Sequence, residues 1–175
     1  MRLFIAINFP NEIKAAIAKI RDRVKEAAFR GNFTLDENLH QTLVFLGECD
    51  ARQADAIKVV MDETVFSEFT LTLDKVGCFK RNGGAIWWIG LQENESLSAL
   101  QADLTGRLSQ KDFILENRKY TPHVTIGREV KMRTGFVQPK VPQAEFNVTN
   151  IELMKSERIN DKLVYTQVYS KSTTH

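Results

Sequence analysis

Two of the three histidines of the chain lie in the same short sequence context. His40 is followed by Thr42 and His123 by Thr125, with one residue between the members of each pair. On a β-strand, residues i and i+2 project from the same face, so each imidazole would share a face with its threonine. Imidazole titrates near neutral pH, which allows one histidine to remove a proton while the other delivers one. Threonine hydroxyls can donate to an anion, so the set suits an in-line displacement at a phosphodiester.

One arginine near the second motif could bind the phosphate. Arg128 lies five residues after His123, whereas the matching position of the first motif is the apolar Phe45. A guanidinium can clamp a phosphate through two hydrogen bonds; the alternative is an arginine that only faces solvent. The stretch 118–140 carries six basic residues and one acidic residue, a local positive charge that suits a polyanion such as RNA.

The two motifs recur within a larger internal repeat. The order strand, helix, strand with His-x-Thr occurs twice, at about residues 1–47 and 84–130, with an offset of 83 residues. Each predicted helix carries four apolar residues at helical spacing: Ile13, Ile17, Ile20 and Val24 in the first copy, and Leu97, Leu100, Leu104 and Leu108 in the second. The repeat predicts a single domain, residues 1–175, made of two lobes related by an approximate twofold axis. That symmetry would bring the two histidine-bearing faces together across a cleft.

The remaining pattern predicts an α+β fold. Strands are expected over residues 2–9, 40–46, 69–73, 85–91, 113–115, 123–126, 145–154 and 163–169, and helices from 13 to a turn at 30–32, over 50–64, and from 96 to about 108. Short strands separated by helices favour antiparallel or mixed sheets with helices on one face. Trp87 and Trp88 are neighbours on one predicted strand, so one should enter the core while the other could line a nucleobase slot or cover a surface. Phe9 and Phe79 are candidates for base stacking, although core packing is the simpler interpretation.

Composition excludes several classes of protein. The 175 residues are 43% hydrophobic and 26% charged, which is typical of a globular protein and not of a disordered or fibrous one. Because 24 Lys and Arg side chains stand against 22 Asp and Glu, bulk charge does not make the chain a nucleic-acid-binding polycation. Two cysteines form no disulfide framework, and we expect a cytoplasmic monomer with no membrane anchor. The cysteines and histidines form no zinc-binding pattern, so we expect no metal and no cofactor.

The paired His-x-Thr-x motifs resemble those of the 2H phosphoesterase superfamily. The chain is most similar to the RNA 2′,3′-cyclic phosphodiesterases, also called 2′-5′ RNA ligases. The similarity extends over most of the chain and includes residues 2–7, 40–48, 77–79, 86–90 and 122–128. This resemblance implies a bilobal 2H phosphoesterase fold: two antiparallel sheets related by a pseudo-twofold axis, helices on their outer faces and a central cleft.

The resemblance also implies a reaction and a role for each site residue. The expected reaction is metal-independent hydrolysis of an RNA or nucleotide 2′,3′-cyclic phosphate to a 2′-phosphomonoester. His40 would be the general acid that protonates the 3′ oxygen, and His123 the general base that activates water. Thr42 and Thr125 would bind the phosphate, with Arg128 nearby. The residues alone leave the division between acid and base open, because the two motifs are alike.

Three alternatives stay open. The same residues could run the chemistry in reverse and join a 2′,3′-cyclic end to a 5′-hydroxyl, as a 2′-5′ RNA ligase does. The cleft could instead bind an RNA end or a nucleotide without chemistry, or the two histidines could be buried structural residues. The third histidine, His175, ends the chain and is expected to take no part.

Overall fold

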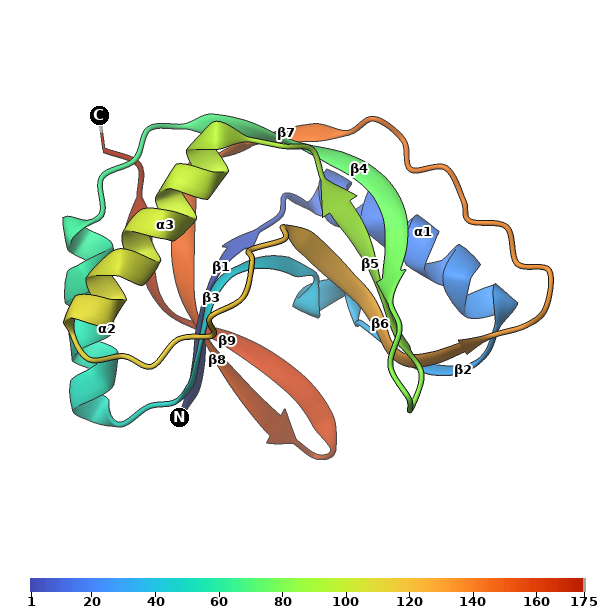
Figure 1. Ribbon diagram of the computed structural model, residues 1–175, viewed down its shortest axis with the longest axis horizontal. Helices are drawn as coiled ribbons and strands as arrows, with labels where there is room; N and C mark the ends of the chain where they lie inside the picture. The colour runs from blue at the N-terminus through green and yellow to red at the C-terminus, as the bar shows by residue number, and fades with distance from the viewer. Residues whose placement is uncertain (175) are drawn as a thin grey trace.

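The computed structural model describes residues 1–174, and His175 lies outside the described residues. Strands and helices alternate along most of this part of the chain (Figure 1). The strands are β1 (Arg2–Asn8), β2 (Ala28–Phe33), β3 (His40–Glu48), β4 (Phe69–Phe79), β5 (Ala85–Leu91), β6 (His123–Met132), β7 (Glu145–Val148), β8 (Asn150–Ile159) and β9 (Lys162–Ser172). The helices are α1 (Asn11–Ala27), the short 3₁₀-helix η1 (Asp36–Asn38), α2 (Ala51–Glu63) and α3 (Glu95–Gln110).

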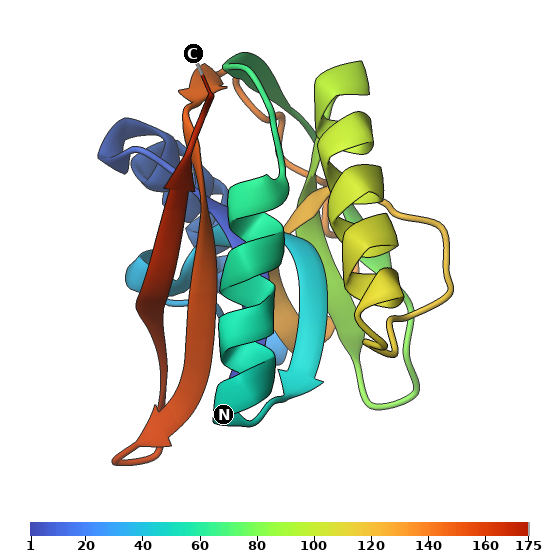
Figure 2. The same ribbon diagram turned by 90° about the vertical axis from the view of Figure 1, so that its left-hand side faces the viewer.

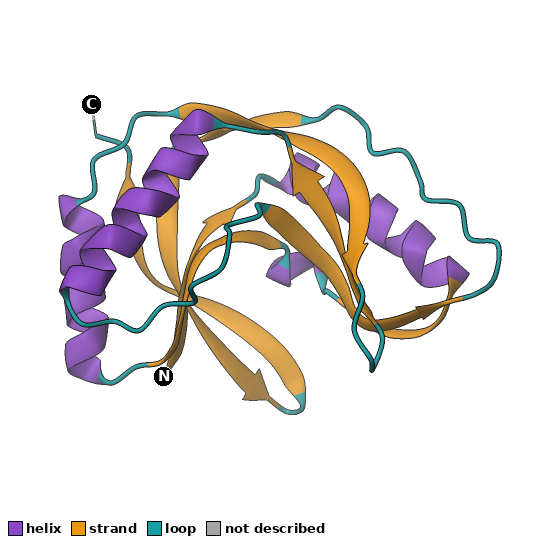
Figure 3. Ribbon diagram, viewed as in Figure 1, coloured by secondary structure: helices purple, strands orange, loops and turns teal. Residues whose placement is uncertain are grey.

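The strands form two antiparallel sheets (Figures 1 and 3). One sheet has four strands in the order β3-β1-β8-β9, and the other has five in the order β2-β6-β5-β4-β7. Every pair of neighbouring strands is antiparallel. Strand β3, at one edge of the four-stranded sheet, contacts β6 of the five-stranded sheet. The prediction of an α+β fold with two antiparallel sheets is therefore confirmed.

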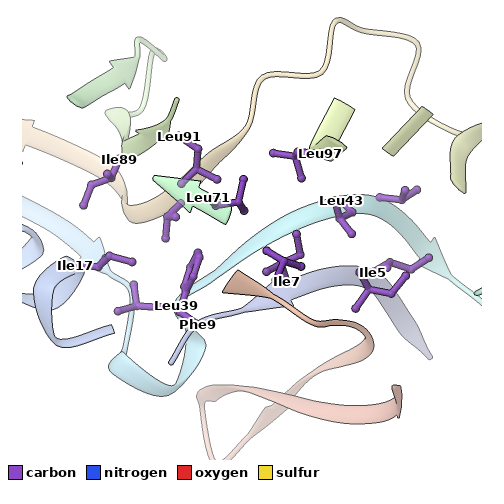
Figure 4. Packing of buried hydrophobic residues seen from close by; sticks show 14 of the residues in the cluster. Ile5, Ile7, Phe9, Ile17, Leu39, Leu43, Leu71, Ile89, Leu91 and Leu97 are labelled. Atoms are coloured by element: carbon purple, nitrogen blue, oxygen red, sulfur yellow. The ribbon is translucent and has the colours of Figure 1, made fainter. Parts of the chain in front are cut away.

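The helices cover the sheet faces opposite the histidines and complete the core. Helix α1 contacts β2 and β6, and α3 contacts β3 and α2, which stands beside it in Figure 2. Both predicted apolar stripes are buried, and each buried Ile or Leu stabilises the fold by about 1.5–3 kcal/mol. Figure 4 shows Leu97 of α3 above Leu43 of β3, the residue that follows Thr42 and points into the core. No helix within residues 1–174 is long and apolar enough to cross a membrane.

Corresponding elements of the two repeat copies occur in the same order. Strand β1, helix α1 and strand β3 of the first stretch correspond to β5, α3 and β6 of the second. Strands β1 and β5 begin 83 residues apart at Arg2 and Ala85, as do β3 and β6 at His40 and His123. Strand β1 pairs with β3 as β5 pairs with β6. Each histidine is therefore the first residue of a corresponding strand.

Residues 28–33 form β2, where the sequence predicted only the end of a helix. This strand pairs with the outer edge of β6. Its side chains lack the alternation of a half-buried strand, because Phe29 is exposed and Gly31 packs closely against Val130. The free edge of β6, and not the local sequence, determines this strand.

The prediction of a strand at residues 113–115 is wrong, because the structure has no strand there. Asp112 adopts a left-handed conformation with φ 62°, and the amide of Phe113 donates to the carbonyl of Leu108, which closes the end of α3. The chain then continues as a loop in which Ile114 is 98% exposed.

The run predicted as one strand over 145–154 is two strands in different sheets. Strand β7 pairs with β4 and β8 pairs with β1, so the chain passes from one sheet to the other at Thr149. Strand β4 in turn extends well beyond residue 73, because an irregularity between Leu73 and Val76 lets it continue along β5.

A buried polar contact joins β3 to the loop before β6. Gln41 is 1% exposed, and its amide nitrogen donates to the Tyr120 hydroxyl at 2.8 Å. The Tyr120 hydroxyl donates in turn to the Thr42 carbonyl at 3.2 Å, and burial raises its pKa so that it keeps its proton. Because Gln41 follows His40 and Tyr120 precedes His123 by three residues, this contact fixes the two histidine segments relative to one another.

Replacing Tyr120 with phenylalanine would leave the buried Gln41 amide without this partner. We expect Tyr120→Phe to lower the free energy of unfolding by about 1–3 kcal/mol, measured by urea denaturation. Tyr169→Phe is the matched control, because the Tyr169 hydroxyl donates to Asp62 at the surface and its loss should cost less. Equal losses in the two variants would contradict the structural role of Tyr120.

Candidate active site

Both imidazoles are oriented by the same hydrogen bond. The Nδ1 atom of His40 lies 2.7 Å from the Asn38 carbonyl, and that of His123 lies 2.6 Å from the Thr121 carbonyl. In each case the carbonyl belongs to the residue two positions before the histidine. Because a carbonyl oxygen only accepts, Nδ1 carries the hydrogen and donates it. Nε2 is therefore the atom of each neutral ring that is left to accept a proton.

The first threonine lies against its histidine, as the spacing predicts. The Thr42 hydroxyl is 2.9 Å from His40 Nε2 and donates to it, since this nitrogen has no hydrogen in the neutral ring. Thr125 is half-buried on β6, and its carbonyl accepts from the Thr34 hydroxyl at 3.0 Å. Thr34 of the first repeat copy thus helps to hold the strand that carries the second motif.

Two aromatic rings enclose His40. Its ring centroid lies 4.9 Å from that of Phe4 on β1 and 5.1 Å from that of Tyr165 on β9. Phe4 and Tyr165 also contact one another edge to face at 5.0 Å. These rings desolvate the imidazole and restrict its rotation.

Two other aromatic rings border His123. The ring centroids of Phe79 and Trp88 lie 5.4 Å and 6.3 Å from the imidazole. The Trp88 ring lies flat over Gly77, where any side chain would overlap it. Gly77 is therefore required for the position of Trp88, and through it for the wall beside His123.

The remaining aromatic candidates divide between core and site. Trp87 is 6% exposed and packs in the core, so the expectation that only one of the two tryptophans is buried there holds. Phe9 is also 6% exposed and contacts Phe146 at 5.0 Å, in agreement with core packing. Phe79, for which core packing was the simpler interpretation, lies instead beside His123.

Burial keeps His40 uncharged at neutral pH and in mildly acidic solution. Desolvation, opposed by the hydrogen bond to the Asn38 carbonyl, lowers the pKa of His40 to about 4. The positive charges of Arg128, Lys14 and His123 add to this effect. His123 is one of these charges, and β3, which begins at His40, contacts β6, which begins at His123.

His123 has the same kind of surroundings. Burial lowers the pKa of His123, and the charges of Arg128 and Arg118 lower it further. Within residues 1–174, each charged side chain that shifts the pKa of either imidazole is a cation. Neutral imidazoles surrounded by positive charge are suited to bind an anion.

Arg128 lies on the same face of β6 as His123 because β6 contains a bulge. On a regular strand, residues five apart point to opposite faces. Thr125 is opposite Trp88 and Gly127 is opposite Trp87, so Ile126 is an extra residue without a partner on β5. The bulge returns Arg128 to the face of the second motif, where it is exposed and pairs with no acid of the described chain.

Sequence reasoning missed the groups that orient and enclose the rings. Asn38 and Thr121 are themselves 83 residues apart, so the repeat contained a signal for the two carbonyls. Phe4 lies on the first strand, where an apolar run gives no sign that one side faces a site. Tyr165 belongs to the C-terminal stretch, which has no counterpart in the repeat and carries no recognisable signal.

The described residues 1–174 contain no group of three or more His, Cys, Asp or Glu side chains placed to hold a metal ion. Cys49 is buried and Cys78 is half-buried, and both are free. Burial raises the pKa of Cys49, so this side chain remains a thiol at neutral pH.

The lowered pKa of His40 links protonation to stability. Below pH 6.5 the unfolded chain binds a proton at this residue, whereas the folded protein binds it only near pH 4. Stability present above pH 6.5 is therefore lost as the pH falls, by roughly 3 kcal/mol for this group. We expect the free energy of unfolding of His40→Gln to fall less steeply between pH 6.5 and 4 than that of the wild type. Parallel curves in urea denaturation at each pH would contradict the burial of a neutral His40.

Known proteins resemble this chain over most of its length. The family model of the 2′-5′ RNA ligase superfamily matches residues 9–160. The RNA 2′,3′-cyclic phosphodiesterase of Thermotoga maritima is 34% identical over 131 residues, which are 73% of this chain and 70% of that protein. The protein of the same name from Methanocaldococcus jannaschii is 34% identical over 164 residues, which are 89% of this chain and 91% of that protein.

A solved structure shows the same architecture. The crystal structure of E. coli LigT complexed with 3′-AMP has a TM-score of 0.87 and 28% sequence identity, and the match covers 99% of this chain and 98% of that one. The resemblance drawn from the paired motifs is thus confirmed. Since the family match includes both His-x-Thr segments with the strands that carry them, the chain belongs to the 2′-5′ RNA ligase superfamily.

Proposed function

We propose that this chain is an RNA 2′,3′-cyclic phosphodiesterase, which hydrolyses a 2′,3′-cyclic phosphate on RNA or a nucleotide to a 2′-phosphomonoester. The observation that carries this proposal is that His40 and His123 begin two strands that contact one another, and that each ring binds a backbone carbonyl through Nδ1 and has cations around it. The relatives named RNA 2′,3′-cyclic phosphodiesterase support the same reaction.

The two histidines would act on opposite sides of the phosphorus. His123 Nε2 removes a proton from water as the water oxygen attacks phosphorus. The bond between phosphorus and the 3′ oxygen breaks, and protonated His40 delivers its proton to that oxygen. The product keeps the phosphate on the 2′ oxygen. Each proton transfer is worth on the order of a hundredfold to ten-thousandfold in rate.

His40 must gain a proton before it can act as the acid. In the free protein, burial and nearby cations oppose this protonation. A bound phosphodiester brings a negative charge beside the ring, which offsets those cations and raises the pKa of the imidazole. Binding of the substrate would therefore itself prepare the acid.

The remaining site residues would hold the phosphate. Arg128 supplies a guanidinium without an acidic partner in the described chain, which suits two hydrogen bonds to phosphate oxygens. Thr125 shares the face of His123 and offers its hydroxyl to the same anion. Thr42 can turn its hydroxyl from His40 to a phosphate oxygen once the imidazole is protonated, because the ring nitrogen then no longer accepts.

We also propose that residues 1–175 are a single domain made of two lobes, with repeated elements at about residues 1–47 and 84–130. The equal spacing of β1 and β5, and of β3 and β6, supports this division. The Gln41 contact with Tyr120 crosses between the two stretches and would make them a unit.

Ligation is a second candidate, because the family model that matches this chain is that of the 2′-5′ RNA ligase superfamily. A 5′-hydroxyl would then replace water as the nucleophile, with the same two histidines. Incubation with one RNA ending in a 2′,3′-cyclic phosphate and another beginning with a 5′-hydroxyl separates the reactions, since ligation yields a longer RNA and hydrolysis does not.

Substitution of either histidine should abolish turnover. With adenosine 2′,3′-cyclic phosphate and excess chelator, we expect His40→Ala and His123→Ala to lower kcat by at least about a hundredfold, because each variant loses one proton transfer. Product analysis by phosphorus NMR should show a 2′-monophosphate from the wild type. His175→Ala, the remaining histidine of the chain, is the matched control. Undiminished turnover in the first two variants would refute the proposal, and tight binding without turnover by the wild type would favour a binding module.

The pH dependence should report both lowered pKa values. Activity requires one imidazole protonated and the other neutral, so kcat/KM should be bell-shaped. Because burial lowers both pKa values below 6.5, we expect kcat/KM to fall as the pH rises above about 6.5 and to fall again below about pH 4. A plateau that continues to pH 8 would contradict this environment of the two rings.

A further inference from the structure

The first repeat copy contains the same bulge as the second but lacks its arginine. On β3, Thr42 is opposite Ala6 and Val44 is opposite Ile5, so Leu43 is an extra residue without a partner on β1. The bulge returns Phe45 to the face of the first motif, opposite Phe4. Phe45 is 40% exposed at this place, where the second copy has Arg128.

A guanidinium from another strand covers Phe45. The central carbon of the Arg2 guanidinium lies 5.0 Å from the Phe45 ring centroid, a distance typical of a cation–π contact. Arg2 precedes Phe4 by two residues on β1, so it shares the face on which Phe4 contacts His40. The first copy therefore also presents a guanidinium on the site face, at the end of β1 away from Asn8, the residue opposite His40.

The charge of Arg2 has no acidic partner within residues 1–174. The nearest candidate is Glu48, opposite Arg2 on β3, and it pairs with the N-terminal ammonium of Met1 at 3.3 Å. Glu157 on the other neighbouring strand pairs with Lys155 at 2.7 Å. Arg2 is thus an exposed guanidinium, held in place by an aromatic ring and not by an opposite charge.

Arg2 is placed where it could bind the same RNA strand as Arg128. The charges of both arginines act on the Tyr165 hydroxyl, whose ring packs against His40. The Phe4 ring, which shares the face of Arg2 on β1, contacts both His40 and Tyr165, so Arg2 lies on the surface that continues from the first motif and can contact a second negative group of a bound strand. In the proposed reaction the cyclic phosphate lies at the histidines, and the RNA continues from there only in the 5′ direction.

We infer that Arg2, positioned by Phe45, binds the phosphate on the 5′ oxygen of the nucleotide that carries the cyclic phosphate. The inference rests on the proposed function and adds a substrate preference to it. An RNA end has this 5′ phosphate, whereas a nucleoside 2′,3′-cyclic phosphate with a free 5′-hydroxyl does not. Arg2 therefore makes the site selective for RNA ends over free cyclic nucleotides, through a charge-assisted pair with the phosphate oxygens.

The test compares two probes that differ only in this group: adenosine 2′,3′-cyclic phosphate with a 5′-hydroxyl and the same nucleotide with a 5′-phosphate. We expect Arg2→Ala to lower kcat/KM for the 5′-phosphorylated probe by about tenfold or more, through KM, because this contact is equal in the ground state and the transition state. Turnover of the 5′-hydroxyl probe should not change, which also shows that the variant is folded. Phe45→Leu should give a smaller loss, again only with the 5′-phosphorylated probe.

Arg23→Ala is the matched control, because Arg23 is an exposed arginine on α1 and should affect neither probe. Equal losses of Arg2→Ala on both probes, or no loss on either, would overturn the inference while leaving the proposed function intact. A wild-type protein that turns over neither probe would instead overturn the proposed function itself.

Discussion

The chemistry proposed for this chain depends on a hydrogen bond that occurs twice, from imidazole Nδ1 to the carbonyl two residues earlier. This bond selects the tautomer, so that both rings present Nε2 to the site. It needs a defined backbone immediately before a strand, and both histidines are the first residues of their strands. The sheets and the contact between Gln41 and Tyr120 then hold the two strand ends together. Aromatic rings at each imidazole exclude water and keep it neutral.

The two bulges show how a duplicated unit acquires different functions in its copies. Each strand gains an extra residue directly after its threonine, Leu43 in β3 and Ile126 in β6, and each bulge aims the residue two positions further at the site. In one copy that residue is Arg128, and in the other it is Phe45. Both copies have the backbone bulge, whereas the side chain at the position that it orients differs between them. A site built in this way keeps its geometry while its charge distribution diverges.

Much of this arrangement could be predicted from the sequence, and the failures have physical causes. The periodicity of apolar residues predicted β1, α1 and α3, and the recurrence of His-x-Thr predicted that His40 and His123 begin corresponding strands. The strand β2 could not be predicted, because its position depends on a free edge of β6. The bulges could not be predicted either, since on a regular strand Arg128 and His123 would point to different faces. Tyr165 comes from a segment without a repeat counterpart, and only the tertiary pairing of β8 with β1 brings its hairpin to His40.

The unrepeated C-terminal hairpin has a consequence for regiochemistry. A pocket with a true twofold axis would accept a cyclic diester in two equivalent orientations, with either ester oxygen against either imidazole. Tyr165 stands beside His40 alone, and Phe79 and Trp88 stand beside His123. In the proposed reaction, these unequal walls would make the two orientations differ in energy, so that one ring oxygen of the diester would consistently be the leaving group. The asymmetry of the surroundings, and not the matched pair of histidines, would then decide which isomer is released.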